Sequence, residues 1–181
     1  MKKLFVVVLL IFSMALLACG GNAGEKSVAK SNEFQQQFST VLKSYFELKD
    51  ALVASDATLA ANKAKALKDA VASVSSASLS TEAQSLWKNI SATLVAAADE
   101  LVAAADLNAQ RAAFQKISDG LINSAKQLNA VSTTVYVQHC PMALDNQGGD
   151  WLSDQKEIFN PYFGEGMMYH CGTVKETLAA K

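Results

Sequence analysis

Apolar side chains recur at spacings of three and four residues over most of the chain between Glu33 and Thr133. This spacing places them on one face of an α-helix, with polar or small residues on the other face. The same stretch contains no proline and a single glycine, Gly120. The pattern therefore predicts a series of amphipathic helices. The first apolar stripe consists of Phe34, Phe38, Val41, Tyr45, Leu48 and Leu52.

Residues suited to capping a helix N-terminus divide this region into four helices. Serine, aspartate and asparagine side chains can accept a hydrogen bond from the free N–H groups of the first turn. The second helix is expected to begin near Ser55 or Asp56, and the third near Ser80. The fourth is expected to begin near Asp106 or Asn108.

Four amphipathic helices of roughly 20 residues with short links are most simply closed as an up-down bundle. We therefore expect an all-α fold in which residues 33–132 form an up-down four-helix bundle. Trp87 and Phe114 lie at helical spacing among leucines, so we interpret them as core residues and not as the wall of a ligand pocket.

The amino-acid composition of the chain changes after Thr133. The run Thr134–Val137 favours a short β-strand, and prolines and glycines then punctuate the chain. Residues 133–181 are expected to form a loop-rich cap, with short helices at Trp151–Ile158 and Thr173–Ala180. Its aromatic residues are sufficient to pack the cap against the bundle, so residues 33–181 are predicted to be a single domain.

The N-terminus resembles a bacterial lipoprotein signal. Two lysines precede an apolar run, Leu4–Leu17, which is followed by Ala18 and Cys19. The resemblance implies that residues 1–18 are a signal peptide and that Cys19 becomes the lipid-bearing first residue. A plain secretory signal and an uncleaved anchor are the alternatives. The glycine-containing segment 19–32 is expected to be a flexible tether.

Removal of the first 18 of 181 residues leaves about 163, enough for one domain. Without Lys2 and Lys3, the 16 basic and 17 acidic residues reduce to a net charge of about −3. This balance offers no basic face for nucleic acid, so nucleic-acid binding is excluded. The expected location is the cell envelope, where the lipid holds the protein on the periplasmic side of one membrane or on the outer membrane.

Every sulfur and imidazole side chain after Cys19 lies in the predicted cap. Thiolate and thioether groups are the ligands that cuprous copper prefers, at low coordination number. Copper could take Cys140, Cys171, Met142 and one of Met167 or Met168. The full set of candidate metal ligands is His139, Cys140, Met142, Met167, Met168, His170 and Cys171.

Zinc would instead favour a tetrahedron of Cys140, Cys171, His139 and His170. The spacing of these residues matches none of the usual zinc-finger patterns, and adjacent His-Cys pairs are awkward ligands for one ion. Copper is therefore the preferred metal. A disulfide between Cys140 and Cys171 is an equally simple explanation, because an exported protein meets oxidising surroundings. The spacing leaves the metal site and the disulfide open.

No catalytic motif is present in the sequence. It contains no Cys-x-x-Cys, no His-Glu-x-x-His and no glycine-rich phosphate loop. His139 and Cys140 are adjacent, and neighbouring residues rarely place a base and a nucleophile correctly. We therefore expect that the protein is not an enzyme.

Several stretches of the chain resemble a domain of unknown function. That domain occurs as a stand-alone exported protein and as an appendage of periplasmic adaptor subunits in copper and heavy-metal efflux pumps. The stretches that carry the resemblance are Val135–Ala143, Trp151–Ser153, Lys156–Ile158, Asn160–Gly164, Cys171–Thr177 and, in the helical part, Tyr45–Leu52.

The resemblance implies a helical domain with a metal-linked role. The positions that match the family's motifs are Cys140, Met142 and Cys171, while an apparent extra residue leaves Met167 and Met168 as alternatives. The leading hypothesis is a lipid-anchored periplasmic protein that binds cuprous copper and acts in metal efflux or homeostasis, with an efflux adaptor as partner. The alternative is a disulfide-stapled helical interaction module that binds no metal.

Overall fold

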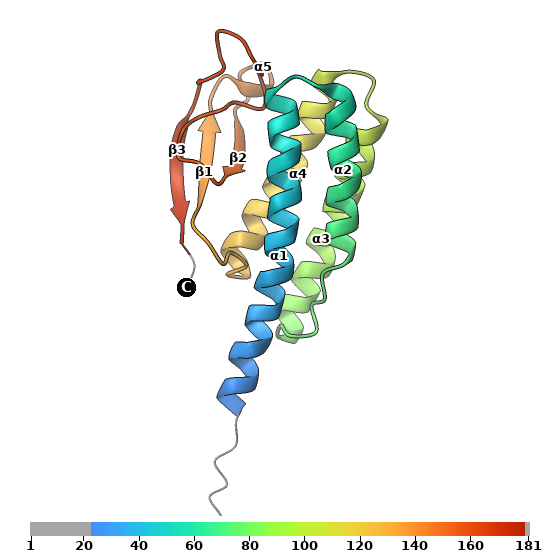
Figure 1. Ribbon diagram of the computed structural model, residues 1–181, viewed down its shortest axis with the longest axis vertical. Coiled ribbons are helices and arrows are strands. Elements are labelled where there is room, and N and C mark those ends of the chain that lie inside the picture. Colours follow the sequence, from blue (N-terminus) through green and yellow to red (C-terminus); the bar gives the residue numbers. More distant parts are fainter. Residues whose placement is uncertain (1–22, 180–181) are drawn as a thin grey trace, which may run out of the picture.

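The computed structural model describes the backbone of residues 23–179 and the side chains of residues 33–179. Within this part of the chain, four main helices precede a small three-stranded sheet (Figure 1). The proposed signal peptide and Cys19 lie outside the described residues. The elements in order are α1 (Ala23–Val53), α2 (Ala57–Ala72), α3 (Thr81–Ala103), α4 (Leu107–Gln127), β1 (Val135–Cys140), α5 (Ala143–Asn146), β2 (Gly149–Ser153) and β3 (Thr173–Leu178).

The predicted helix starts are confirmed by three N-caps. The side chain of Asp56 accepts a hydrogen bond from the N–H of Leu59 at the start of α2. Ser80 and Asp106 make the equivalent contacts at the starts of α3 and α4. The first helix differs from expectation, because it begins at Ala23, inside the segment expected to be a flexible tether. The part of that segment from residue 23 on includes Ala23, Glu25, Lys26, Ala29 and Lys30, all of types that favour helix.

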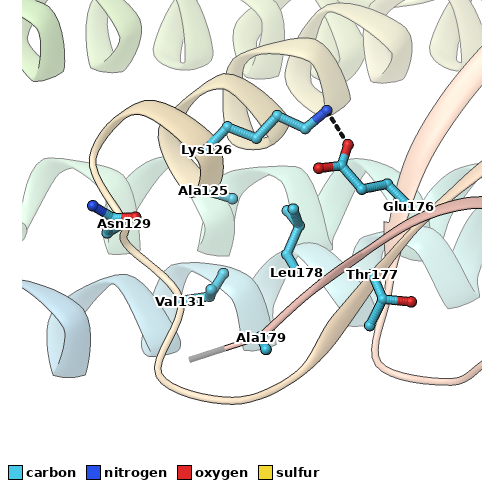
Figure 2. A pocket seen from close by; sticks show the side chains of 8 residues that line it. All are labelled: Ala125, Lys126, Asn129, Val131, Glu176, Thr177, Leu178 and Ala179. Atoms are coloured by element: carbon cyan, nitrogen blue, oxygen red, sulfur yellow. Dashed lines mark ion pairs between the residues drawn. The ribbon is translucent and has the colours of Figure 1, made fainter. Parts of the chain in front are cut away.

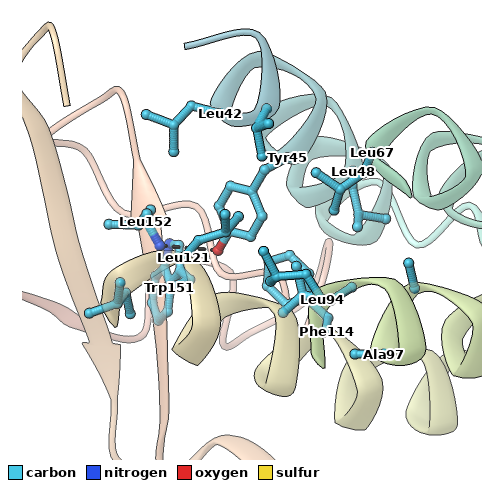
Figure 3. Close-up of a cluster of buried hydrophobic side chains, with 14 of the residues drawn as sticks. Leu42, Tyr45, Leu48, Leu67, Leu94, Ala97, Phe114, Leu121, Trp151 and Leu152 are labelled. Carbon is cyan, nitrogen blue, oxygen red and sulfur yellow. Dashed lines mark hydrogen bonds between the residues drawn. The ribbon is translucent and has the colours of Figure 1, made fainter. Parts of the chain in front are cut away.

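Each helix packs against the next one in the chain, α1 against α2, α2 against α3 and α3 against α4. Trp87 and Phe114 are buried in the core between them, as predicted. The Trp87 ring meets Phe34 edge-on, with ring centroids 5.4 Å apart. Gly120 lets α4 approach α3 closely, because a Cβ there would lie only 2.8 Å from Leu94 Cδ2. Figure 3 shows part of this core.

The all-α prediction is confirmed only in part: the four main helices are present, but the C-terminal part forms an antiparallel sheet with strand order β2-β1-β3. The strand expected at Thr134–Val137 is confirmed as β1, which begins one residue later and continues to Cys140. In the part of the chain that the structure describes, neither of the two short helices expected at Trp151–Ile158 and Thr173–Ala180 is present: β2 takes up Trp151–Ser153 with irregular chain after it, and β3 takes up Thr173–Leu178. A helix of two turns is only marginally stable. Pairing with both edges of β1 supplies the backbone hydrogen bonds that such a helix would otherwise make.

Contacts at both outer strands fix the sheet to the helices. Strand β2 packs against α4. At the other edge of the sheet, Lys126 near the end of α4 forms an ion pair with Glu176 of β3, beside a cavity of about 390 Å³ (Figure 2). Among the described residues, no helix is both long enough and apolar enough to cross a membrane.

Candidate functional site

The structure brings together the two cysteines that the sequence singled out. The Sγ atoms of Cys140 and Cys171 lie 2.8 Å apart, and both residues are free thiols. Cys140 ends β1, and Cys171 lies two residues before β3 begins. Because β1 and β3 pair antiparallel, with His139 opposite Thr173, the end of one strand meets the start of the other. The strand register therefore creates the thiol pair.

Two residues hold the chain around Cys171 in place. Asn160 donates a side-chain hydrogen bond of 2.7 Å to the carbonyl of Cys171. Gly172 has a φ of +142°, and a Cβ there would lie 2.8 Å from the carbonyl oxygen of His139. Glycine is required at this close approach between the two segments. The sequence interpretation did not assign a role to either residue, although the Asn-Pro turn and the Cys-Gly step were visible signals.

The environment favours the protonated form of Cys171. The hydrogen bond with Cys140, followed by desolvation, raises the pKa of Cys171 to about 11. Cys140 is fully buried, whereas Cys171 is partly exposed. A metal ion binds the thiolate form, so binding at this pair must displace protons.

The three candidate methionines differ in exposure. Met142 follows Cys140 by two residues and is 47% exposed. Met167 is fully exposed, and Met168 is partly buried. The carbonyl of Met168 accepts a hydrogen bond from the N–H of Cys171, which places Met168 in the turn that carries the second thiol. Thioether sulfurs thus flank both cysteines along the chain.

Both histidine rings are held by other partners. His139 and Cys140 are consecutive in β1, so their side chains leave opposite faces of the sheet. The Nδ1 atom of His139 lies 2.6 Å from a carboxylate oxygen of Asp150, its cross-strand neighbour in β2. His170 Nδ1 donates to the carbonyl of Ile158 at 2.7 Å. Within residues 33–179, no group of three or more His, Cys, Asp and Glu side chains is placed to hold one ion.

Asp150 joins the two outer strands on the His139 side of the sheet. Its second carboxylate oxygen lies 2.7 Å from Lys175 Nζ. Desolvation tends to raise the pKa of Asp150, but the hydrogen bonds from Lys175 and His139 outweigh it, so this pKa is lowered. The sequence interpretation missed Asp150 and Lys175, because their proximity depends on strand pairings that it did not predict.

The chain matches a family described as a protein of unknown function (DUF3347) over residues 41–133. This match spans half of the chain, so the protein belongs to that family. No curated protein and no solved structure matches the chain. The matched region begins within α1 and ends just before β1, so it covers the helices, and the two cysteines lie beyond it.

Proposed function

We propose that this protein binds a soft metal ion, cuprous copper, through Cys140 and Cys171. The observation that supports the proposal is the 2.8 Å separation of their sulfurs, which come from two distant stretches of the chain. Cuprous copper accepts a small number of soft ligands, and two thiolates meet most of that need. Met142 and one of Met167 or Met168 are the candidate additional ligands.

Zinc suits the arrangement less well. A zinc site takes four ligands in a tetrahedron, and His139 leaves the sheet on the face opposite to Cys140, so it is badly placed to share one ion with the two thiols. Two thiolates with an exposed thioether nearby fit a softer ion of lower coordination number.

Metal binding requires a local movement of the thiols. At metal–sulfur distances of about 2.3 Å, two sulfurs on one ion lie roughly 3.8 Å or more apart. Cys171 is the residue expected to move, because it is partly exposed and lies in a turn, whereas Cys140 is buried in β1. The pKa of Cys171 is raised to about 11, so metal must compete with its proton at lower pH. The affinity for metal should therefore rise with pH.

The biological setting we propose follows from the N-terminus and the resemblance described above. Cleavage before Cys19 and lipidation of that residue would anchor the protein in the cell envelope. The four helices, in an up-down bundle, would carry the metal-binding sheet away from the lipid. The proposed partner is a periplasmic adaptor of a metal efflux pump. The protein would either pass the metal ion to this adaptor or buffer the ion concentration near it.

A competition titration tests the proposal. The full-length protein, fully reduced and kept anaerobic, is titrated against a coloured cuprous chelator. We expect one equivalent of copper to leave the chelator, and the double variant Cys140→Ser, Cys171→Ser to remove none. Met142→Leu should weaken binding without abolishing it. Equal competition by the wild type and the double-serine variant would reject the thiol pair as the site.

A disulfide-stapled interaction module is the second candidate function. The short distance between the sulfurs favours it, because the two thiols need little movement to form a bond. Closing a loop over the 31-residue separation would stabilise the fold by roughly 3 to 4 kcal/mol on chain-entropy grounds. Thiol alkylation and intact mass, measured on protein extracted from its native membrane, separate the two. Complete oxidation supports the module, and free thiols support metal binding.

A further inference from the structure

A cavity of about 530 Å³ lies where α4, the α5 turn and the loop at Tyr162 and Phe163 meet. This volume lies in the range of small-molecule sites. The cavity is lined by side chains of three separate segments, and neither cysteine is among them. It is therefore distinct from the proposed metal site.

Arg111 of α4 lines this cavity and carries a buried positive charge, with only 9% of the residue exposed. Its Nε donates to the carbonyl of Pro161 at 2.9 Å, and its Nη2 donates to Ser55 Oγ at 3.1 Å. These acceptors are neutral, and desolvation lowers the pKa of Arg111. Among the described residues, no carboxylate pairs with the guanidinium and no acceptor takes a hydrogen bond from its Nη1. A guanidinium keeps its charge in proteins, so this buried cation lacks a counter-ion.

Asp145 lines the same cavity from the α5 turn. The backbone there is left-handed at three consecutive residues, with φ of 52° at Leu144, 58° at Asp145 and 64° at Asn146. Non-glycine residues adopt this conformation at a cost, and runs of it are uncommon outside functional sites. Asp145 forms no ion pair with any described residue. The other charged residue of the lining, Lys116, is already paired with Glu100 at 2.6 Å.

The cavity therefore presents one positive and one negative group, each without a charged partner, on walls from different segments. We propose that it binds a small zwitterion that carries a carboxylate and an ammonium group, of which a free α-amino acid is the simplest class. Arg111 Nη1 would donate to the carboxylate, and Asp145 would accept from the ammonium group. The Phe163 ring and the Leu144 side chain give the rest of the ligand an apolar wall. The proposal is independent of metal binding.

Calorimetric titration of the full-length protein in detergent tests this site. The probes are L-leucine, L-phenylalanine, L-glutamine and L-glutamate, each compared with its amide, which lacks the carboxylate, and its N-acetyl form, which lacks the ammonium group. We expect at least one free amino acid to bind at millimolar concentration or below. Removal of either charge from that ligand should weaken binding by about tenfold or more.

Asp145→Asn is the decisive variant, because asparagine accepts the left-handed backbone as readily as aspartate and the residue is exposed. In this variant the free amino acid and its N-acetyl form should bind equally weakly. Arg111→Lys should weaken binding of the free amino acid, and if that variant fails to fold, Asp145→Asn still decides. The proposal is overturned if none of the four amino acids binds, if the amides or N-acetyl forms bind as well, or if Asp145→Asn leaves affinity unchanged.

Discussion

The hydroxyl of Tyr45 in α1 accepts a hydrogen bond of 3.1 Å from the backbone N–H of Leu152 in β2 (Figure 3). The same hydroxyl lies 2.8 Å from Ser118 Oγ of α4. One buried side chain thus joins the first helix, the last main helix and the sheet. Tyr45 lies within the family match and Leu152 lies outside it, so this contact joins the matched helices to the C-terminal sheet.

Tyr45→Phe should lower the free energy of unfolding by about 1 to 3 kcal/mol, because it leaves the buried N–H of Leu152 without an acceptor. Urea denaturation monitored by circular dichroism measures the change. The control is Tyr136→Phe, since Tyr136 lies in β1 and its hydroxyl bonds to no described residue; this change should have little effect. A Tyr45→Phe protein as stable as the wild type would show that the sheet does not depend on this contact.

At Gly164, the loop that follows Pro161 packs closely against the link between α1 and α2. The φ of this glycine is +64°, and a Cβ there would overlap Ser55 Oγ and lie 3.1 Å from the carbonyl of Val53. We expect Gly164→Ala to destabilise the protein by several kcal/mol, roughly 2 to 4, since the neighbouring backbone cannot give way easily. The same loop offers a control in Gly166, where an added Cβ meets nothing within 4 Å. Thermal unfolding should distinguish the two alanine variants clearly.

The helical part of this fold could be predicted because local signals determine it. The caps at Asp56, Ser80 and Asp106 and the regular apolar spacing each act within a few residues of the chain. Strands β2 and β3 could not be predicted in the same way. They have few residues, and β3 is largely exposed, so their conformation depends on pairing with β1 and not on an apolar period of their own.

The candidate site was predictable in its composition but not in its geometry. The clustering of sulfur residues along the chain identified Cys140 and Cys171 as partners, and their sulfurs are in contact. The side chains of His139 and Cys140 point to opposite faces of the sheet, because consecutive residues of a strand alternate between the faces. This could be inferred only once both residues were known to lie in β1. The cavity at Arg111 had no signal in the sequence, since it joins three segments that are distant along the chain.

The raised pKa of Cys171 predicts slow alkylation. At pH 8.5 a thiol with a pKa of about 11 is almost entirely protonated, and iodoacetamide reacts with the thiolate. Cys140→Ala removes the hydrogen bond that is the largest cause of the shift, so the pKa of Cys171 should fall. The rate at Cys171, followed by mass spectrometry, should then rise by roughly tenfold or more.

Cys140→Ser is the matched control for this experiment, because serine keeps a hydrogen-bonding group beside Cys171 and should give a smaller increase. The rate in the wild type should keep rising with pH beyond 9, the ordinary value for a cysteine thiol. A plateau near pH 9 in the reduced wild type would contradict the proposed hydrogen bond between the two thiols.

Asp150 should make stability depend on pH in the acid range. Hydrogen bonds from Lys175 and His139 lower its pKa below the ordinary 3.8, against the opposing effect of desolvation. A carboxyl group with a lowered folded-state pKa stabilises the fold at pH values above its unfolded pKa. This contribution is lost as the pH falls through the lower folded-state pKa. Asp150→Asn should therefore destabilise the protein at pH 7, by roughly 1 kcal/mol.

The difference in unfolding free energy between the wild type and Asp150→Asn should shrink as the pH falls below about 4, where the carboxyl in the unfolded chain begins to protonate, and should vanish below the lowered folded-state pKa. Urea denaturation at several pH values between 7 and 2.5 measures this difference. Asp154→Asn provides the control, because Asp154 is exposed and forms no ion pair with a described residue, so its difference should stay near zero throughout. A difference at Asp150 that is constant with pH would mean that the asparagine perturbs packing and that the ion pairs contribute little.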